Sequence, residues 1–394
     1  MIRPLRISAF TLCSAAGTGR EQTIAALRER RSGLRRNDFG TTPIDTWIGR
    51  VDGLEQPSLP PSLADWDCRN NRLAWCGLIT DGFRDAVLQA RERYGAGRIA
   101  IVVGTSTSSI GASEEAYTRL DPDGRYPADL RRPIIHTPHS LGDFVQHALG
   151  LTGISVTVAT ACSSSAKVFA QAERLMRLGL ADAAVVGGVD TLCGSVLFGF
   201  NSLELVSPQL CRPFDVERRG INLGEAAGFA LLERDAGAGP WLIGYGESND
   251  AYHMSTPHPE GIGARAALAD TLDRAGITAA DVGYINLHGT ASQKNDEMEA
   301  RVVADLFPPD TVASSTKGWT GHTLGAAGIV ETGITLLALE HGVLPGTLNA
   351  ATLDPVCGPQ VRLENTSRSV DRALSFSFGF GGSNCVLAFA RSAP

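Results

Sequence analysis

One cysteine lies where an expected strand gives way to an expected helix. Cys162 belongs to the segment Thr160-Ala161-Cys162-Ser163-Ser164-Ser165-Ala166, which follows an apolar strand at Ser155–Val158. The positive end of a helix favours a thiolate, which is the nucleophilic form of cysteine. Small neighbouring residues leave room for an acyl group. The alternative is a buried structural cysteine, which is the usual fate of a free thiol.

A histidine follows the strand expected at Tyr284–Leu287. His288 stands in Asn286-Leu287-His288-Gly289-Thr290, at the carboxyl end of that strand, where open α/β sheets bind their ligands. Asn295 and Asp296 come shortly afterwards. In the simpler interpretation His288 is a turn residue, and Asp296 is an acid favoured in the first turn of a helix.

A second histidine is preceded by a lysine in Lys317-Gly-Trp-Thr-Gly-His322-Thr-Leu-Gly-Ala-Ala-Gly328. The sequence predicts that His322 begins a helix. A helix N-terminus and a nearby lysine both disfavour imidazolium, and a neutral imidazole can donate a hydrogen bond to a developing oxyanion. Tight packing of a helix start explains the glycines of this segment, but it does not explain Lys317.

A glycine-rich turn is expected near the C-terminus. The segment Phe378-Gly379-Phe380-Gly381-Gly382-Ser383-Asn384 separates the apolar runs Ala373–Ser377 and Cys385–Phe389. It could serve only as a β-turn. A backbone N–H in such a turn could also point at an oxyanion.

The elements that must position these residues alternate between strands and helices. Further strands are expected at Ile99–Val103 and Ala183–Val186, and helices at Ala166–Leu178, Ala264–Ala275 and His322–Leu339. Such alternation predicts an α/β fold. The breaker-rich stretch Asp235–Pro240 is the best internal boundary and divides the chain into residues 1–239 and 240–394.

Composition excludes several classes of function. The net charge is −7 among 394 residues, which does not suit a nucleic-acid-binding protein. The eight cysteines form no Cys-x-x-Cys pair, so neither a zinc site nor a redox motif is indicated, and we expect a reduced, cytoplasmic protein. No run of 18 apolar residues predicts a membrane span, and the N-terminal residues are expected to form a strand rather than a signal peptide.

Taken together, these four segments resemble the elongating β-ketoacyl-acyl carrier protein synthases. The order Cys, His-Gly-Thr, Lys-x-x-x-Gly-His, Gly-Phe-Gly-Gly is specific in combination, and the likeness covers nearly the whole chain. The resemblance implies the thiolase fold, in which two similar α/β halves stack as five layers, αβαβα. It also implies a decarboxylative Claisen condensation that needs no cofactor and no metal.

The resemblance assigns a role to each residue. Cys162 would carry the acyl group, and the backbone N–H groups of Cys162 and Phe380 would form the oxyanion hole. His288 and His322 would stabilise the enolate that forms when malonyl-carrier protein loses carbon dioxide. Lys317 would support His322, with Glu331 beside the lysine and Asp296 in a supporting acidic position. Phe378 and Phe380 match the aromatic gate beside the nucleophile.

The resemblance also implies partners. The enzyme would receive acyl and malonyl groups from an acyl carrier protein, which Arg69 and Arg72 would help to dock. An (i, i+3) spacing places these arginines on one helical face, although an ordinary solvated basic face explains them as well. Thr107 matches a position near the acyl tunnel. The family works as a dimer, and the sequence leaves both a homodimer and a heterodimer with a chain-length factor open.

Other readings remain open at this stage. Arg69-Asn70-Asn71-Arg72 and departures such as Ala226 and Arg219 resemble the ketosynthases of aryl polyene and xanthomonadin-type pigment pathways, so fatty-acid and polyene synthesis are both open. A non-catalytic chain-length factor would have the same fold, but such partners typically lack the nucleophilic cysteine. A thiolase or acyl-CoA acyltransferase is the third reading, against which the Lys317–Gly328 segment argues. Chain length and saturation of the acyl group are not fixed by the sequence.

Overall fold

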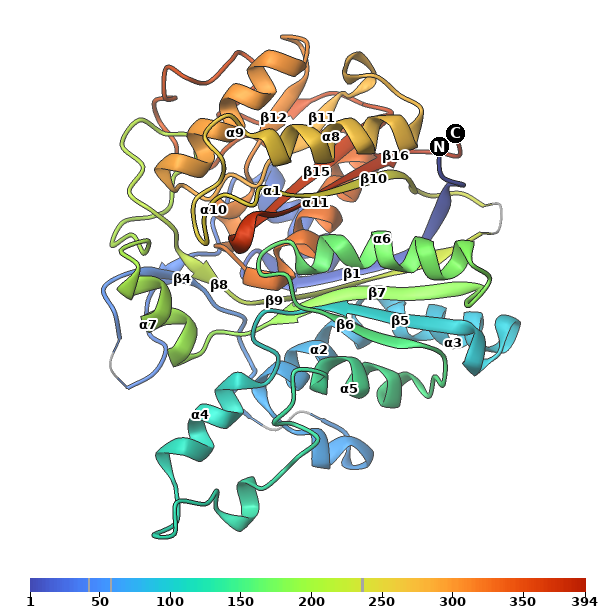
Figure 1. The fold of residues 1–394 in the computed structure, drawn as a ribbon, viewed down its shortest axis with the longest axis vertical. Coiled ribbons are helices and arrows are strands. Elements are labelled where there is room, and N and C mark those ends of the chain that lie inside the picture. The colour runs from blue at the N-terminus through green and yellow to red at the C-terminus, as the bar shows by residue number, and fades with distance from the viewer. Residues whose placement is uncertain (42, 57–58, 235–236) are drawn as a thin grey trace.

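The chain forms one large mixed sheet flanked and interleaved by helices (Figure 1). The computed structural model describes residues 1–41, 43–56, 59–234 and 237–394. Five main strands come from the first part of the chain: β1 (Leu5–Ser14), β5 (Ile99–Gly104), β6 (Ser155–Val158), β7 (Ala183–Asp190) and β9 (Ala226–Glu233). Five come from the second: β10 (Trp241–Asn249), β11 (Tyr284–Asn286), β12 (Val312–Ser314), β15 (Arg372–Gly379) and β16 (Ser383–Ala390).

The two sets of strands have the same topology. The first set is ordered β6-β5-β7-β9-β1 across the sheet, and the second is ordered β12-β11-β15-β16-β10. When the strands of each set are numbered along the chain, both orders become 3-2-4-5-1. The sets join where β1 pairs antiparallel with β10, with Leu5 opposite Leu242. The chain is therefore built from two similar halves, although the sequence contains no visible repeat of identical residues.

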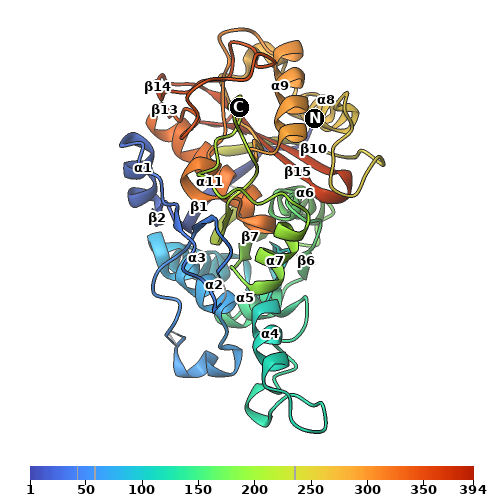
Figure 2. The same ribbon diagram turned by 90° about the vertical axis from the view of Figure 1, so that its left-hand side faces the viewer.

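Helices complete a five-layer arrangement (Figure 2). The central layer holds α6 (Ser164–Arg177) and α11 (Ala327–His341), which contact strands of both halves. The outer layer over the first half contains α2 (Arg69–Ile79), α3 (Phe83–Tyr94) and α5 (Ser140–Leu149). The outer layer over the second half contains α8 (Ile262–Ala275) and α9 (Gln293–Leu306). This is the expected αβαβα thiolase fold.

Burial explains which segments form the interior. Every residue of β5, β7 and β9 is buried, and these strands read as continuous apolar runs because helices cover both of their faces. The helix α11 is buried from Ala327 to Leu339, as expected for the middle layer. None of the helices in the described part of the chain is both long and apolar enough to cross a bilayer.

The strand predictions are confirmed, and one helix prediction is wrong at its start. The segment expected to be helical from His322 instead contains α10 (Lys317–Thr320), a loop, a 3-10 turn at Leu324–Ala326 and then α11. Gly321 takes a positive φ of 71°, and the backbone N–H of His322 bonds to Asn222 O at 2.7 Å. The chain at His322 therefore pairs with its neighbour β8 (Leu223–Gly224) before the helix begins.

Smaller elements lie around this frame. They are α1 (Arg20–Arg28), β2 (Gly17–Thr18), β3 (Arg35–Arg36), β4 (Trp47–Gly49), β13 (Val343–Leu344) and β14 (Thr366–Ser367). The helix α4 (Ile110–Thr118) and the loop after it project away from the body, near α7 (Gly194–Ser202) (Figure 2). The predicted boundary at Asp235–Pro240 includes Asp235 and Ala236, which lie outside the described residues, and the division there stays a prediction.

Candidate active site

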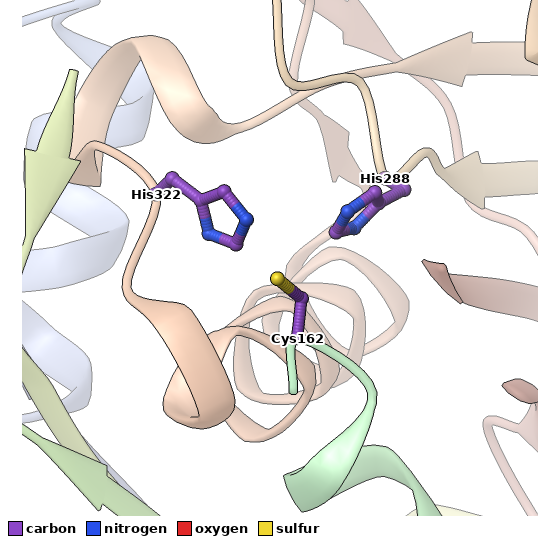
Figure 3. A group of neighbouring side chains, drawn as sticks. All are labelled: Cys162, His288 and His322. Carbon is purple, nitrogen blue, oxygen red and sulfur yellow. The ribbon is translucent and has the colours of Figure 1, made fainter. Parts of the chain in front are cut away.

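Three chemically active side chains from three separate segments meet behind one cleft. Cys162 Sγ and the ring nitrogens of His288 and His322 lie within 4.8 Å of one another. All three side chains are buried, with 2 to 4% of their surface exposed. Figure 3 shows the sulfur of Cys162 pointing between the two imidazole rings. The spatial arrangement that the sequence requires is therefore present.

A tight turn between β6 and α6 presents the cysteine. Ala161 has a φ of 51°, which is uncommon for a residue with a side chain and turns the chain sharply just before Cys162. Serine hydroxyls hold this turn: Ser163 Oγ donates to Thr160 O at 2.9 Å, and Ser164 Oγ donates to Ala161 O at 2.6 Å. The serines that follow the nucleophile thus fix its backbone.

The thiol of Cys162 is less acidic than the sequence suggests. Burial raises its pKa to about 11, and the charge of Lys317 and the backbone N–H of Phe380 oppose this rise. The helix α6 begins at Ser164, two residues after Cys162, so desolvation outweighs the helix field that the sequence argument invoked. The backbone N–H of Phe380 interacts with the sulfur, and its place in an oxyanion hole stays a prediction.

His288 is fixed through its backbone by a buried acid. Glu299 accepts hydrogen bonds from the N–H groups of His288 and Gly289, each at 2.7 Å. Gly289 has a positive φ of 36°, and a Cβ there would lie 2.4 Å from the Cβ of Ser315, so a larger residue would not fit. The sequence argument missed Glu299. The available signal was its position one helical turn after Asp296 on α9.

Lys317 contacts His288 rather than His322. Its Nζ lies 3.4 Å from Nδ1 of His288 and also donates to the His288 carbonyl and to the Glu331 carboxylate. The predicted Lys317–Glu331 contact is therefore observed, and both side chains are buried. The predicted support of His322 by Lys317 is corrected: the lysine reaches that ring through its charge, and its hydrogen bonds go to His288.

Hydrogen bonds assign the same tautomer to both rings. Nδ1 of His322 accepts the backbone N–H of Leu324 at 3.2 Å, and Nδ1 of His288 faces the Lys317 ammonium. The proton of each neutral ring is therefore on Nε2. Burial, followed by the charge of Lys317, holds the pKa of both imidazoles well below the ordinary value of 6.5. The cleft thus contains two neutral N–H donors. The lowered pKa of His322 is due to burial and to Lys317 rather than to a helix N-terminus, because α11 begins only at Ala327.

Asp296 shapes the loop that follows His288. Its carboxylate accepts the N–H groups of Thr290 at 2.9 Å and Ala291 at 3.1 Å, and that of Phe214 at 2.9 Å. The side chain is buried, and burial raises the pKa of the carboxyl. Asp296 therefore supports the site through the backbone, as a positioning residue.

The cleft opens to solvent and has a cavity volume of about 60 Å³. Phe378 and Phe380 line it together with Cys162 and the two histidines. The ring of Phe380 packs against Phe200 of α7 at 5.6 Å between centroids, and the ring of Phe378 lies 6.0 Å from that of His288. The glycine-rich turn therefore brings both phenylalanines to the mouth of the site.

The same three residues offer the donor set of a metal ion, since one thiolate and two imidazoles are ligands that zinc accepts. The Lys317 ammonium beside His288 disfavours a further cation there. A thiol whose pKa is raised to about 11 is also a poor source of thiolate. The residues therefore fit an organic substrate with a developing negative charge better than a metal.

Comparisons with known proteins agree with this geometry. The family descriptions "Beta-ketoacyl synthase, N-terminal domain" and "Beta-ketoacyl synthase, C-terminal domain" match residues 73–238 and 241–351. Together these matches cover more than half of the chain. The chain belongs to the β-ketoacyl synthase family. It is an enzyme of that family, because relatives of known activity match along most of its length.

Two curated relatives and one solved structure illustrate the likeness. Nodulation protein E of Rhizobium meliloti (strain 1021) is 35% identical over 330 residues, covering 78% of this chain and 79% of that protein. The 3-oxoacyl-[acyl-carrier-protein] synthase 2 of Staphylococcus aureus is 32% identical over 328 residues, covering 78% and 81%. A ketosynthase in complex with its chain length factor from Xenorhabdus doucetiae is similar in structure, with a TM-score of 0.90, 36% identity and 98% of each chain covered.

Other predicted residues of this β-ketoacyl synthase lie outside the cleft. Arg69 pairs with the fully buried Glu225 and with Glu55, and Arg72 pairs with Asp67. Both guanidinium groups are thus engaged by carboxylates of their own chain. A role in docking a carrier protein stays a prediction.

Thr107 lies beside the active site on a different cavity. Its N–H and hydroxyl donate to the buried carboxylate of Asp190, at 2.8 and 2.6 Å. Asp190 also accepts the N–H of Ala326 at 3.1 Å and so ties the loop of Thr107 to the segment after His322. Thr107 lines a cavity with Ile110 and Ile135 rather than the cleft of Cys162, and its place on the acyl tunnel stays a prediction.

Proposed function

We propose that this protein is a β-ketoacyl-acyl carrier protein synthase that catalyses decarboxylative Claisen condensation. The observation that supports the proposal is that Cys162 Sγ and one ring nitrogen of each of two neutral imidazoles lie within 4.8 Å of one another in an open cleft. A thiol suits covalent capture of an acyl group. Paired neutral donors suit an enolate oxygen.

The first half-reaction loads the enzyme. Cys162 Sγ attacks the carbonyl carbon of an acyl thioester, and the carrier thiol leaves. The backbone N–H groups of Cys162 and Phe380 would bind the oxyanion of the tetrahedral intermediate. The N–H of Phe380 and the charge of Lys317 oppose the rise in pKa that burial causes, and so make the attacking thiolate more accessible than burial alone would allow.

The second half-reaction forms the carbon–carbon bond. The malonyl thioester loses carbon dioxide, and the electron pair left behind forms an enolate whose oxygen receives Nε2–H bonds from His288 and His322. Because both rings are neutral, they stabilise the enolate without protonating it outright. The enolate carbon then attacks the acyl-Cys162 thioester, the thiolate leaves, and a 3-ketoacyl product remains on the carrier. No other cofactor is required, because departure of carbon dioxide drives the step.

The presence of Cys162 together with His288 and His322 argues against a non-catalytic chain-length partner. The Lys317–Glu331 pair behind His288 argues against a thiolase, in line with the sequence argument. The pathway is proposed only in outline, as fatty-acid or polyene and polyketide-type synthesis. The likeness to a chain from a ketosynthase–chain length factor complex supports a specialised pathway and a dimeric assembly.

The test of this function is a condensation assay with malonyl and acyl carrier proteins. We expect Cys162→Ala to abolish formation of the 3-ketoacyl product, since no other thiol among the described residues lines the cleft to replace it. Cys357→Ala is the matched control, because that cysteine is half-buried outside the cleft. Malonyl-dependent extension that persists in Cys162→Ala would show that the nucleophile is assigned wrongly.

A further inference from the structure

Two cysteines that are far apart in the sequence touch in the fold. Cys13 lies on β1 and Cys76 on α2, and their sulfur atoms are 3.7 Å apart. The helix α2 packs directly on β1 and β9. Both thiols are free, and neither is among the side chains that line the cleft of Cys162. The contact is therefore separate from the condensation site.

The two sulfur atoms are in contact but not at bonding distance. A disulfide requires a sulfur–sulfur distance of about 2.05 Å, so the two atoms must approach by roughly 1.7 Å. Cys13 is fully buried, whereas Cys76 is half-buried. A small oxidant from solvent therefore reaches Cys76 first, and Cys13 is the less accessible thiol beside it.

The surroundings favour a reactive thiolate at Cys76, the more accessible of the two cysteines. The hydrogen bond from Cys13 lowers the pKa of Cys76 to about 7, and the same contact raises the pKa of Cys13. The hydroxyl of Thr80 lies 3.8 Å from Cys13 Sγ and lowers the pKa of both thiols. Thiolates react with peroxides, and neutral thiols do so poorly. By contrast, burial raises the pKa of Cys162 to about 11.

We propose that Cys13 and Cys76 form a reversible disulfide when the protein meets a peroxide. The Cys76 thiolate attacks one oxygen of hydrogen peroxide, the O–O bond breaks, and Cys76 becomes a sulfenic acid; the leaving hydroxide takes up the proton that the Cys76 thiol lost on ionisation and departs as water. The thiol of Cys13 then attacks the Cys76 sulfur, the S–O bond breaks, and a second water leaves with the thiol proton. In total, two thiols and one peroxide give one disulfide and two waters.

The cross-link would fasten a helix whose first residue is tied to a buried acid of the interior. The first residue of α2, Arg69, pairs with buried Glu225. Glu225 in turn accepts the N–H groups of Val51 at 2.9 Å and Leu192 at 3.1 Å. Oxidation therefore ties α2 to β1 at Cys76 and Cys13, while the other end of the helix stays anchored through Arg69.

The experiment is peptide mapping of the full chain under non-reducing conditions after brief treatment with hydrogen peroxide. We expect a linked pair of peptides containing Cys13 and Cys76, 2 Da lighter than the two reduced peptides together, which dithiothreitol separates again. We also expect the oxidised protein to melt a few degrees higher, because the bond closes a long loop in the unfolded chain.

Two variants keep the test independent of folding changes. In Cys13→Ser, Cys76 should stop at the sulfenic acid and be trapped by dimedone, and the rise in melting temperature should vanish. Cys357→Ser carries the same substitution at another half-buried cysteine and should still give the linked peptides. If wild-type Cys76 is oxidised or alkylated and no linked peptide forms, the proposal is overturned. This result would leave the proposed condensation reaction untouched.

Discussion

At the scale of single residues, the decisive feature is that two imidazoles stay neutral beside a buried ammonium. Burial and the charge of Lys317 both lower the pKa of His288 and His322. A neutral Nε2–H can donate to an oxyanion and keep its proton. This property distinguishes enolate stabilisation from general acid catalysis at the same positions.

The two histidines should therefore matter more for decarboxylation than for loading. We expect His288→Ala or His322→Ala to slow malonyl decarboxylation by about 100-fold or more, as removal of an oxyanion donor typically does. Acylation of Cys162 should fall much less, since in the proposed mechanism its oxyanion is bound by backbone N–H groups. Intact-mass detection of the acyl-enzyme, with carbon dioxide release measured in parallel, separates the two steps. Equal losses in both steps would contradict this division of roles.

The buried acid behind His288 should leave a signature in the pH dependence of stability. Burial raises the pKa of Glu299 from 4.5 to about 8, so between these values the folded state holds a proton that the unfolded state has lost. The contribution of this residue to stability is full below about pH 4.5 and is lost as the pH rises through about 8. In Glu299→Gln the decrease in the free energy of unfolding with pH that Glu299 causes should disappear.

Urea unfolding at a series of pH values from 5 to 9 provides the measurement for Glu299. The difference between wild type and variant isolates one group, because the shifted histidines and Glu331 titrate in both proteins. The free energy of unfolding of the wild type should fall more steeply with pH than that of Glu299→Gln. If the free energies of unfolding of wild type and variant change with pH in parallel, Glu299 is ionised throughout, as its three N–H donors would favour.

The sequence predicted the identity of the reacting residues better than their electrostatics. Cys162, His288, His322 and Lys317 stand in an order of motifs that is specific enough to name each of them. Burial raises the pKa of Cys162, against the predicted direction, whereas burial and Lys317 lower the pKa of His322, in the predicted direction. Burial depends on the packing of both halves around the site, which no local pattern of residues reveals.

At the scale of elements, glycines let the central helices approach each other behind the nucleophile. A Cβ on Gly328 of α11 would lie 2.5 Å from the backbone nitrogen of Ala166 on α6. A Cβ on Gly333, one and a half turns later, would meet the side chain of Leu12 at 3.2 Å. The first contact is with backbone, and the second is with a side chain that can move. These two glycines form a matched pair on one helix.

Alanine should therefore be destabilising at Gly328 and nearly neutral at Gly333. In Gly328→Ala we expect a loss of about 1–3 kcal/mol in the free energy of unfolding, because α6 and α11 must separate. In Gly333→Ala the gain in helix propensity of about 1 kcal/mol offsets the tighter packing. Thermal unfolding measures both, and condensation activity should fall only in Gly328→Ala. Equal stability of the two variants would show that the helices can shift apart freely.

Strands were easier to predict from the sequence than the start of α11. The runs at β5, β6, β7 and β11 are short, apolar and bounded by breakers, and each forms a strand within a few residues of its expected limits. The stretch from His322 to Gly328 has helical composition, yet its first residues pair with β8. That tertiary pairing overrides local propensity and turns His322 toward the cleft rather than into a helix.

At the scale of the whole molecule, the repeated 3-2-4-5-1 topology explains why the site lies between the halves. The loop after the third strand of the first half carries Cys162, and the loop after the second strand of the second half carries His288. The central helices bring these loops together. The family resemblance predicted two similar halves, but neither the strand order within them nor the Cys13–Cys76 contact could be read from the sequence, because both depend on pairings between distant segments.

The same topology leaves one edge strand available for assembly. β6 ends the sheet, and all four of its residues are half-buried. Carbonyls of Ile154 and Val158 accept hydrogen bonds from the β5 side. Because inward and outward groups alternate along a parallel strand, the N–H of Thr157 faces the open edge. Pairing of this edge with a second chain would account for the dimer that the family resemblance implies.

A proline at this edge should therefore weaken assembly while sparing the fold. We expect Thr157→Pro to remove one outward N–H from a strand position where proline is tolerated, and to shift the protein toward monomer. Thr157→Val keeps the N–H and is the matched control. Light scattering coupled to size-exclusion chromatography measures the mass, and circular dichroism verifies that both variants are folded. A folded Thr157→Pro protein with the mass of the wild-type assembly would place the dimer contact elsewhere, with the exposed side chains of α4 and α7 as the next surface to test.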